Sequence, residues 1–136
     1  GISDIKDLQW TKRTAIGVIE LKEDDIFIGR GRQEQDKKTN WVLKITENGK
    51  TYLQIAANEN VGGHIGGIRV NSCHATLKWD SELGRYRLFN YSRNLTYIED
   101  EPIEVGENMV VENHQRITLG GRFSESAFLL WMVYKN

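Results

Sequence analysis

Residues 75–88 read ATLKWDSELGRYRL, and this stretch decides the fold class. In its first half every second residue, Ala75, Leu77 and Trp79, is apolar, and the residues between them are polar or charged. Tyr86 and Leu88 alternate with two arginines in the same way. A period of two is typical of strands with one buried face. The stretch therefore predicts two strands, joined by a turn at the SELG segment.

Runs rich in β-branched and aromatic residues, which favour strands, continue along the rest of the chain. The expected strands cover residues 14–21, 25–29, 41–45, 52–56, 68–71, 75–79, 85–88, 96–99, 108–111, 116–119 and 127–134. Asn48-Gly49 lies between two of them and is a strong signal for a short hairpin. There is no long amphipathic helix. About ten to eleven short strands with frequent turns predict an all-β sandwich or barrel.

Composition limits the classes of partner. The 136 residues include 39% hydrophobic and 27% charged residues, which fits one domain with a packed core. The net charge is −1, so no global field favours nucleic acid or an anionic membrane. The single cysteine, Cys73, cannot form an internal disulfide, which indicates a reducing compartment. The longest apolar run is far shorter than the about 20 residues of a membrane span. We expect a cytoplasmic protein, or the cytoplasmic part of a larger one.

Catalytic and metal-binding patterns fail when tested residue by residue. Gly49-Lys50-Thr51 resembles the end of a phosphate-binding P-loop, but Lys44 stands where that motif needs a glycine. His64, His74 and His114 show no partner at the spacing of metal ligands. We therefore expect no enzyme, no metal site and no cofactor.

Three short patches point to a binding function. They are IFIGR at residues 26–30, VNSCHA at 70–75 and SRNLTYI at 92–98. In order and in kind they resemble the signatures of the forkhead-associated (FHA) family. Those signatures are Gly-Arg, then Ser-Arg-x-x-His or Ser-x-x-His followed by alanine, then Ser-x-Asn-Gly-Thr. The closing segment ITLG at 117–120 is also typical, and the resemblance covers roughly residues 14–134.

The resemblance implies a twisted β-sandwich of the SMAD/FHA type, whose loops at one end recognise phosphothreonine peptides. A phosphate dianion favours an arginine fork, hydroxyl and amide donors, and backbone N–H groups. By resemblance, Arg30 would contact the phosphate and Asn94 would hold the peptide main chain. Asn71 and Ser72 occupy the loop that supplies further donors. The expected phosphopeptide-binding residues are Arg30, Asn71, Ser72, Asn94, Arg32, Arg69 and Arg93, and the expected structural residues at the site are Gly29, His74 and Thr96.

The chain departs from the family pattern at three of these positions. Asn71 stands where the family has a phosphate-binding serine, Ser72 stands where arginine is common, and Leu95 replaces the glycine after Asn94. The stretch between Arg30 and His74 is also long. We expect an inserted hairpin and loops at residues 31–67, within a sandwich at 14–136 that follows an N-terminal extension at 1–13.

Three functions remain open from the sequence. The first is a module that binds phosphorylated proteins or peptides, with no nucleic-acid or membrane partner and an undetermined oligomeric state. The second is an FHA-like scaffold that binds partners without phosphate. The third is an unrelated sandwich that binds carbohydrate through aromatic platforms. The candidate platforms are Trp10, Trp41, Trp79 and Trp131.

Overall fold

The fold is all-β, as expected from the sequence. The computed structural model describes residues 3–10, 19–30, 41–56, 74–93, 96–120 and 128–135. Twelve strands are assigned within these ranges. They are β1 (Ser3–Trp10), β2 (Ile19–Leu21), β3 (Asp25–Arg30), β4 (Trp41–Glu47), β5 (Lys50–Ala56), β6 (Ala75–Asp80), β7 (Arg85–Asn90), β8 (Thr96–Ile98), β9 (Glu101–Pro102), β10 (Asn108–Val111), β11 (Arg116–Leu119) and β12 (Phe128–Tyr134). Among these residues no helix has the length and apolar character needed to cross a membrane.

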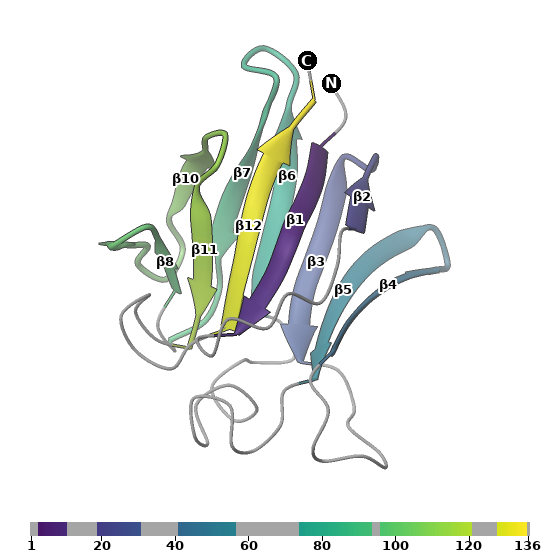
Figure 1. The fold of residues 1–136 in the computed structure, drawn as a ribbon, viewed down its shortest axis with the longest axis horizontal. Helices are drawn as coiled ribbons and strands as arrows, with labels where there is room; N and C mark the ends of the chain where they lie inside the picture. The colour runs from purple at the N-terminus through teal and green to yellow at the C-terminus, as the bar shows by residue number, and fades with distance from the viewer. Residues whose placement is uncertain are drawn as a thin grey trace.

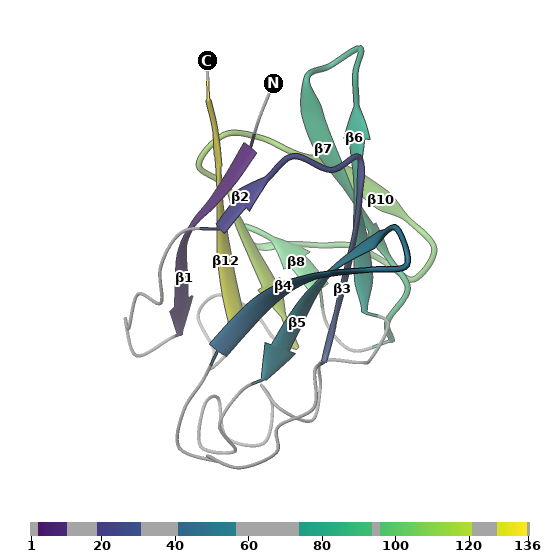
Figure 2. The same ribbon diagram turned by 90° about the vertical axis from the view of Figure 1, so that its right-hand side faces the viewer.

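The strands form two six-stranded sheets (Figure 1). The first sheet has the order β2-β1-β12-β11-β8-β9, and the second has the order β10-β7-β6-β3-β5-β4. Figure 2 shows them as two layers, with β1 and β12 on one side and β3 and β6 on the other. Most neighbours pair antiparallel, whereas β3 and β5 run parallel. The architecture is therefore a β-sandwich.

The core lies between the sheets and is built by the period-two pattern. Ile26 and Ile28 of β3, Leu77 of β6 and Leu88 of β7 are all almost fully buried. They face Ile117 and Leu119 of β11 and Leu130 of β12 in one apolar cluster. Trp79 packs against this cluster and contacts the ring of Tyr86 edge-on at 5.0 Å.

The hairpin predicted at Asn48-Gly49 is confirmed. Glu47 and Lys50 pair across the turn, so β4 and β5 are joined by a two-residue loop. Asn48 has a φ of 52° and Gly49 a φ of 76°. These left-handed conformations are what a tight hairpin turn requires, and asparagine and glycine tolerate them best. The hairpin lies within residues 31–67, the stretch where we expected a hairpin and loops.

Two buried tyrosines close the end of the sandwich where β1 begins and β12 ends. The Tyr134 hydroxyl donates to the backbone oxygen of Val111 at 2.6 Å and accepts the N–H of Tyr86 at 2.9 Å. The Tyr86 hydroxyl donates to the backbone oxygen of Glu23 at 2.6 Å. Burial raises the pKa of Tyr134 to about 12 and that of Tyr86 above its usual range.

A strained turn joins β8 to β9 and is held by one ion pair. Glu99 has a φ of 55°, a conformation that costs energy for a residue with a side chain. Its carboxylate accepts two hydrogen bonds from the Arg116 guanidinium, both at 2.9 Å, and one from the Arg116 backbone N–H at 2.7 Å. These contacts with Arg116 lower the pKa of Glu99.

The structure differs from the predictions in two places, and two further predicted strands lie partly or wholly outside the described residues. Residues 1–13 were expected as an extension outside the sandwich, but Ser3–Trp10 pairs with both β12 and β2. The two-residue strand β9 was not expected. Of the strand expected at 14–21, only Ile19–Leu21 is described, as β2. The strand expected at 68–71 lies outside the described residues.

Candidate functional site

Several strand ends meet at the end of the sandwich opposite the tyrosine pair. β3 ends at Arg30 and β5 runs parallel to it, with Arg30 opposite Ile55. β6 begins at Ala75, which pairs with Asn90 at the end of β7. Figure 1 shows the ends of β3 and β5 close together at the lower end of the coloured strands. The chain therefore leaves β3 and β5 and enters β6 at the same end, which we call the loop end.

His74 joins three strands at the loop end. The residue is fully buried just before β6. Its backbone N–H donates to the backbone oxygen of Ile28 in β3 at 3.0 Å. Its backbone oxygen accepts the N–H of Tyr91, just after β7, at 3.0 Å. Its Nε2 atom lies 2.7 Å from the Thr96 hydroxyl at the start of β8. One buried residue thus fixes the relative positions of β3, β7 and β8.

The hydrogen bonds of Thr96 define the tautomer of His74. Thr96 is 2% exposed, and its hydroxyl donates to Oδ1 of Asn90 at 2.9 Å. A hydroxyl has one proton to donate, so the contact with His74 must be one that the hydroxyl accepts. His74 therefore carries a proton on Nε2 and donates it to Thr96.

Asn90 is the centre of this network, and the sequence analysis did not single it out. Its side chain makes four hydrogen bonds while only 1% exposed. The amide nitrogen donates to the backbone oxygens of Ser92 at 3.0 Å and Ile103 at 2.8 Å. The amide oxygen accepts the Ser92 N–H and the Thr96 hydroxyl. The signal was present in the sequence, because an asparagine in step with Tyr86 and Leu88 must point inward.

The backbone of Asn90 extends the network to the connection between β9 and β10. Its N–H donates to the oxygen of Glu107 at 3.0 Å, and its oxygen accepts the N–H of Gly106 at 2.8 Å. Gly106 has a φ of 85°, which glycine adopts without steric cost. We call His74, Asn90 and Thr96 the bracing network. Its hydrogen bonds hold the segments at 91–93 and 103–107 in place.

The expected binding residues differ in how far the structure describes them. Arg93 is exposed at the loop end, between the braced Ser92 and β8. Arg30 is the last residue of β3 by its backbone, and Gly29 before it is buried. The structure brings His74 and Thr96 into direct contact, in the positions where we expected structural residues. The side chain of Arg30 and the whole of Arg32, Arg69, Asn71, Ser72 and Asn94 lie outside the described residues.

The chemistry available at the loop end is that of a binding site. The bracing network is buried and consists of hydrogen-bond donors and acceptors that are matched to one another, which give a rigid base. Arg93 is exposed at this end, and the backbone of Arg30 ends β3 there. Within the described part of the chain no group of three or more His, Cys, Asp or Glu residues is placed to hold a metal ion. A rigid end that carries the exposed Arg93 suits an anionic ligand.

The structure describes the side chains of two of the four tryptophans that were candidate carbohydrate platforms. Trp79 is partly buried against the core and contacts the rings of Tyr86 and Tyr134. Trp131 donates its indole N–H to the backbone oxygen of His114 at 2.7 Å. Both indoles are engaged within the domain. The side chains of Trp10 and Trp41 lie outside the described residues.

Comparison with known proteins agrees with this architecture. A family model described as the FHA domain matches residues 26–120. The fold is similar to the FHA domain of an Arabidopsis thaliana hypothetical protein, with a TM-score of 0.58, 12% identity, and coverage of 99% of this chain and 86% of that chain. A comparison with curated proteins gives no match.

Two yeast structures are similar in the same way. The N-terminal FHA domain of S. cerevisiae Rad53p, solved in complex with a phosphothreonine peptide, has a TM-score of 0.57, 17% identity, and coverage of 96% of this chain and 94% of that chain. Full-length yeast Pml1p has a TM-score of 0.60, 11% identity, and coverage of 97% of this chain and 80% of that chain. At these identities the similarity is one of fold.

Proposed function

The chain belongs to the FHA domain family, and from that membership we propose that it binds phosphothreonine-containing peptides or proteins through its loop end. FHA domains are interaction modules rather than enzymes, so the family assigns this chain a role in protein–protein contacts. The similar Rad53p domain was solved with a phosphothreonine peptide. We further propose a cytoplasmic location and phosphorylated proteins as partners.

The observation that carries the proposal is the bracing network. A phosphate is recognised by direct contacts of about 3 Å, so its ligands must be held in fixed positions. His74 is fully buried and hydrogen-bonded to Thr96, which in turn is bonded to Asn90. These bonds fix the places where the chain enters β6 and β8. The expected ligands Asn71 and Ser72 come shortly before the start of β6 in the sequence, and Asn94 comes shortly before the start of β8.

Each expected ligand has a chemical task in this proposal. Arg30, at the end of β3, would form a fork with two phosphate oxygens. Asn71 can donate through its side-chain amide in place of the family serine, and Ser72 can donate its hydroxyl. Asn94 would hold the peptide main chain beside the phosphothreonine. Arg93 is exposed next to it and would add positive charge.

The experiment compares binding of a degenerate phosphothreonine peptide library with binding of its unphosphorylated twin, by fluorescence anisotropy. We expect the phosphorylated library to bind at least tenfold more tightly. Arg30→Ala should remove most of that difference, because a charge-assisted hydrogen bond is worth about 1.5–3 kcal/mol and 1.4 kcal/mol is tenfold. Arg85→Ala is the matched control, since Arg85 lies at the opposite end and pairs with Glu112.

Two results would contradict the proposal. Equal binding of both libraries would favour the second function, a scaffold that binds partners without phosphate. Asn71, Ser72 and Leu95 are consistent with that function, because they depart from the family's binding motif. Phosphate-dependent binding that survives Arg30→Ala would place the phosphate elsewhere.

A further inference from the structure

The outer face of the second sheet carries a row of apolar side chains. Strand register places Phe27 of β3 opposite Tyr52 of β5, and Tyr52 opposite Ile45 of β4. The three residues alternate with the core residues of β3 and β5, so they face away from the first sheet. All three are half-buried, and the rings of Phe27 and Tyr52 are 5.5 Å apart. We call them the apolar row, and it leaves aromatic surface available to a partner.

A row of charges with alternating signs runs beside the apolar row on the same face. Asp25 of β3 is opposite Lys78 of β6, and Glu47 of β4 is opposite Lys50 of β5. Asp25 and Lys50 are neighbours too, because each directly precedes a residue that pairs between β3 and β5. Across β6, β3, β5 and β4 the signs are therefore plus, minus, plus and minus. We call these four residues the charged row.

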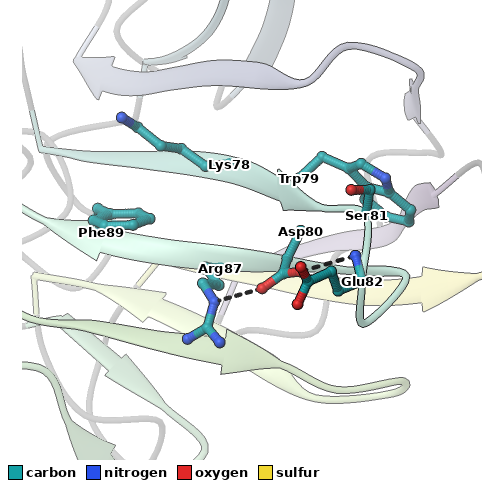
Figure 3. A pocket seen from close by; sticks show the side chains of 7 residues that line it. All are labelled: Lys78, Trp79, Asp80, Ser81, Glu82, Arg87 and Phe89. Atoms are coloured by element: carbon teal, nitrogen blue, oxygen red, sulfur yellow. Dashed lines mark hydrogen bonds and ion pairs between the residues drawn. The ribbon is translucent and has the colours of Figure 1, made fainter.

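The charged row is not neutralised by the residues that the structure describes. All four side chains are exposed, and no ion pair joins any of them to another described residue. The ammonium groups of Lys78 and Lys50 lie over aromatic rings instead, 5.2 Å from the centre of Phe89 and 5.9 Å from that of Phe27. By contrast, Arg87 on the same face is paired with Asp80 at 2.9 Å, as the dashed line in Figure 3 shows. The charged row thus keeps two acids and two bases available to a partner.

A second copy of this chain is the complement of this face. Two copies can face each other about a twofold axis that runs along the strands, midway between β3 and β5. This axis places Asp25 against Lys50 of the second copy, and Lys78 against Glu47 of the second copy. Each contact occurs twice in a twofold interface, so the row makes four ion pairs. Phe27 lies against Tyr52 of the second copy, which covers the centre of the apolar row.

Other axes along the strands do not give this match. An axis on β3 sets Asp25 against its own copy, and an axis on β5 does the same with Lys50. An axis between β6 and β3 sets Lys50 against Arg87, which is opposite Lys78 in register. An axis between β5 and β4 leaves Asp25 and Lys78 outside the overlap. The axis between β3 and β5 is therefore the one along the strands that pairs all four charges.

The shape of the face fits the same arrangement. Figure 2 shows the turn between β4 and β5 extending beyond β3, on the side away from β1 and β12. A hollow of about 420 Å³, lined in part by Lys78 and Glu82, lies on the other half of the face (Figure 3). The axis brings the turn of the second copy, with its Glu47 and Lys50, to this hollow. Turn and hollow both carry an acid and a base, so neither sign is left unmatched.

We propose that the outer face of the second sheet is a homodimer interface, formed by the charged row and the apolar row of two copies. Sheets that pack face to face lie about 10 Å apart with strand directions within about 30°, which is compatible with an axis along the strands. Such an axis leaves both loop ends at the same end of the dimer. The dimer would then present two phosphothreonine sites side by side to a doubly phosphorylated partner, a consequence that rests on the proposed function.

The test is sedimentation velocity of the domain alone, without any phosphopeptide, from about 5 to 500 μM. We expect a monomer–dimer equilibrium in this range. Lys50→Glu and Asp25→Lys should each weaken the dimer about tenfold or more, because each change turns two attractive contacts into repulsive ones. The matched control is Lys135→Glu, which makes the same change in net charge as Lys50→Glu next to β12, where Lys135 pairs with Glu20. It should change the dimer affinity by less than about twofold.

Mixing the two variants gives the sharpest result. In a heterodimer of Lys50→Glu with Asp25→Lys, the two introduced charges are opposite and face each other across the axis. The native Asp25 of the first variant faces the native Lys50 of the second. An equimolar mixture should therefore dimerise with an affinity within about threefold of the unchanged domain, although each variant alone does not.

Three outcomes would overturn the proposal. The first is an unchanged domain that stays monomeric up to about 500 μM. The second is a dimer that the two reversals weaken no more than Lys135→Glu does, which would place the interface elsewhere. The third is a mixture that stays monomeric while circular dichroism shows that both variants are folded. Arg30→Ala should leave the dimer affinity unchanged, so this interface and the loop-end site can fail independently.

Discussion

Replacing Asn90 by alanine tests whether the bracing network holds the loop end together. The change removes four hydrogen bonds of a side chain that is 1% exposed. The backbone oxygens of Ser92 and Ile103 lose their donors, while the Ser92 N–H and the Thr96 hydroxyl lose their acceptor. Orphaned buried groups cost about 1–3 kcal/mol each, and partial access of water reduces the sum. We expect a loss of about 3–5 kcal/mol in the free energy of unfolding.

The assay is urea unfolding followed by tryptophan fluorescence and circular dichroism. With a urea m-value of about 1–3 kcal/mol/M, the midpoint should fall by about 2 M. A domain of this size is typically stable by about 5–15 kcal/mol, so the variant should remain folded in water. Asn108→Ala is the control, because Asn108 is exposed and accepts one hydrogen bond from Arg87. A loss for Asn90→Ala no larger than the control's, about 0.5 kcal/mol or less, would refute the reasoning.

Three further predictions use the same unfolding assay. Gly49→Ala should cost about 1–2 kcal/mol, because the φ is 76° and a Cβ there meets no atom within 4 Å, so backbone strain is the only change. Glu99→Gln should cost about 0.5–1 kcal/mol at pH 7. Arg116 lowers the pKa of Glu99, so this stabilisation is present at neutral pH and should disappear as the pH falls through that lowered pKa. Burial raises the pKa of Tyr86 and raises that of Tyr134 to about 12. The folded state therefore disfavours both tyrosinates, and the free energy of unfolding should fall as the pH rises from about 10, the usual tyrosine pKa, through 12. The ultraviolet absorbance of tyrosinate should appear at a higher pH in the folded protein than in the unfolded chain. Tyrosine titration without a parallel loss of stability would contradict this.

Local patterns predicted most of the fold, because each strand carries its own signal. The alternation from Ala75 to Leu88 indicated β6 and β7, and Asn48-Gly49 indicated the β4–β5 hairpin. The strand Ser3–Trp10 was missed because its sequence, SDIKDLQW, is mostly polar and its pairing with β12 is distant in sequence. The parallel pairing of β3 with β5 has no local signal either.

The site was predictable to a different extent. Resemblance pointed to His74 and Thr96 as structural residues, and the geometry shows them bonded to each other. It did not point to Asn90, whose importance comes from four contacts made in three dimensions.

The central claim is that a phosphothreonine side chain binds at the loop end. The most direct test is a ¹⁵N–¹H NMR titration of the labelled domain with N-acetyl-phosphothreonine methylamide, and with its unphosphorylated counterpart. We predict phosphate-dependent shifts grouped at the backbone amides of residues 30, 71–74 and 92–96. Shifts of equal size with both compounds, or shifts grouped at the opposite end around Tyr86 and Tyr134, would contradict the claim.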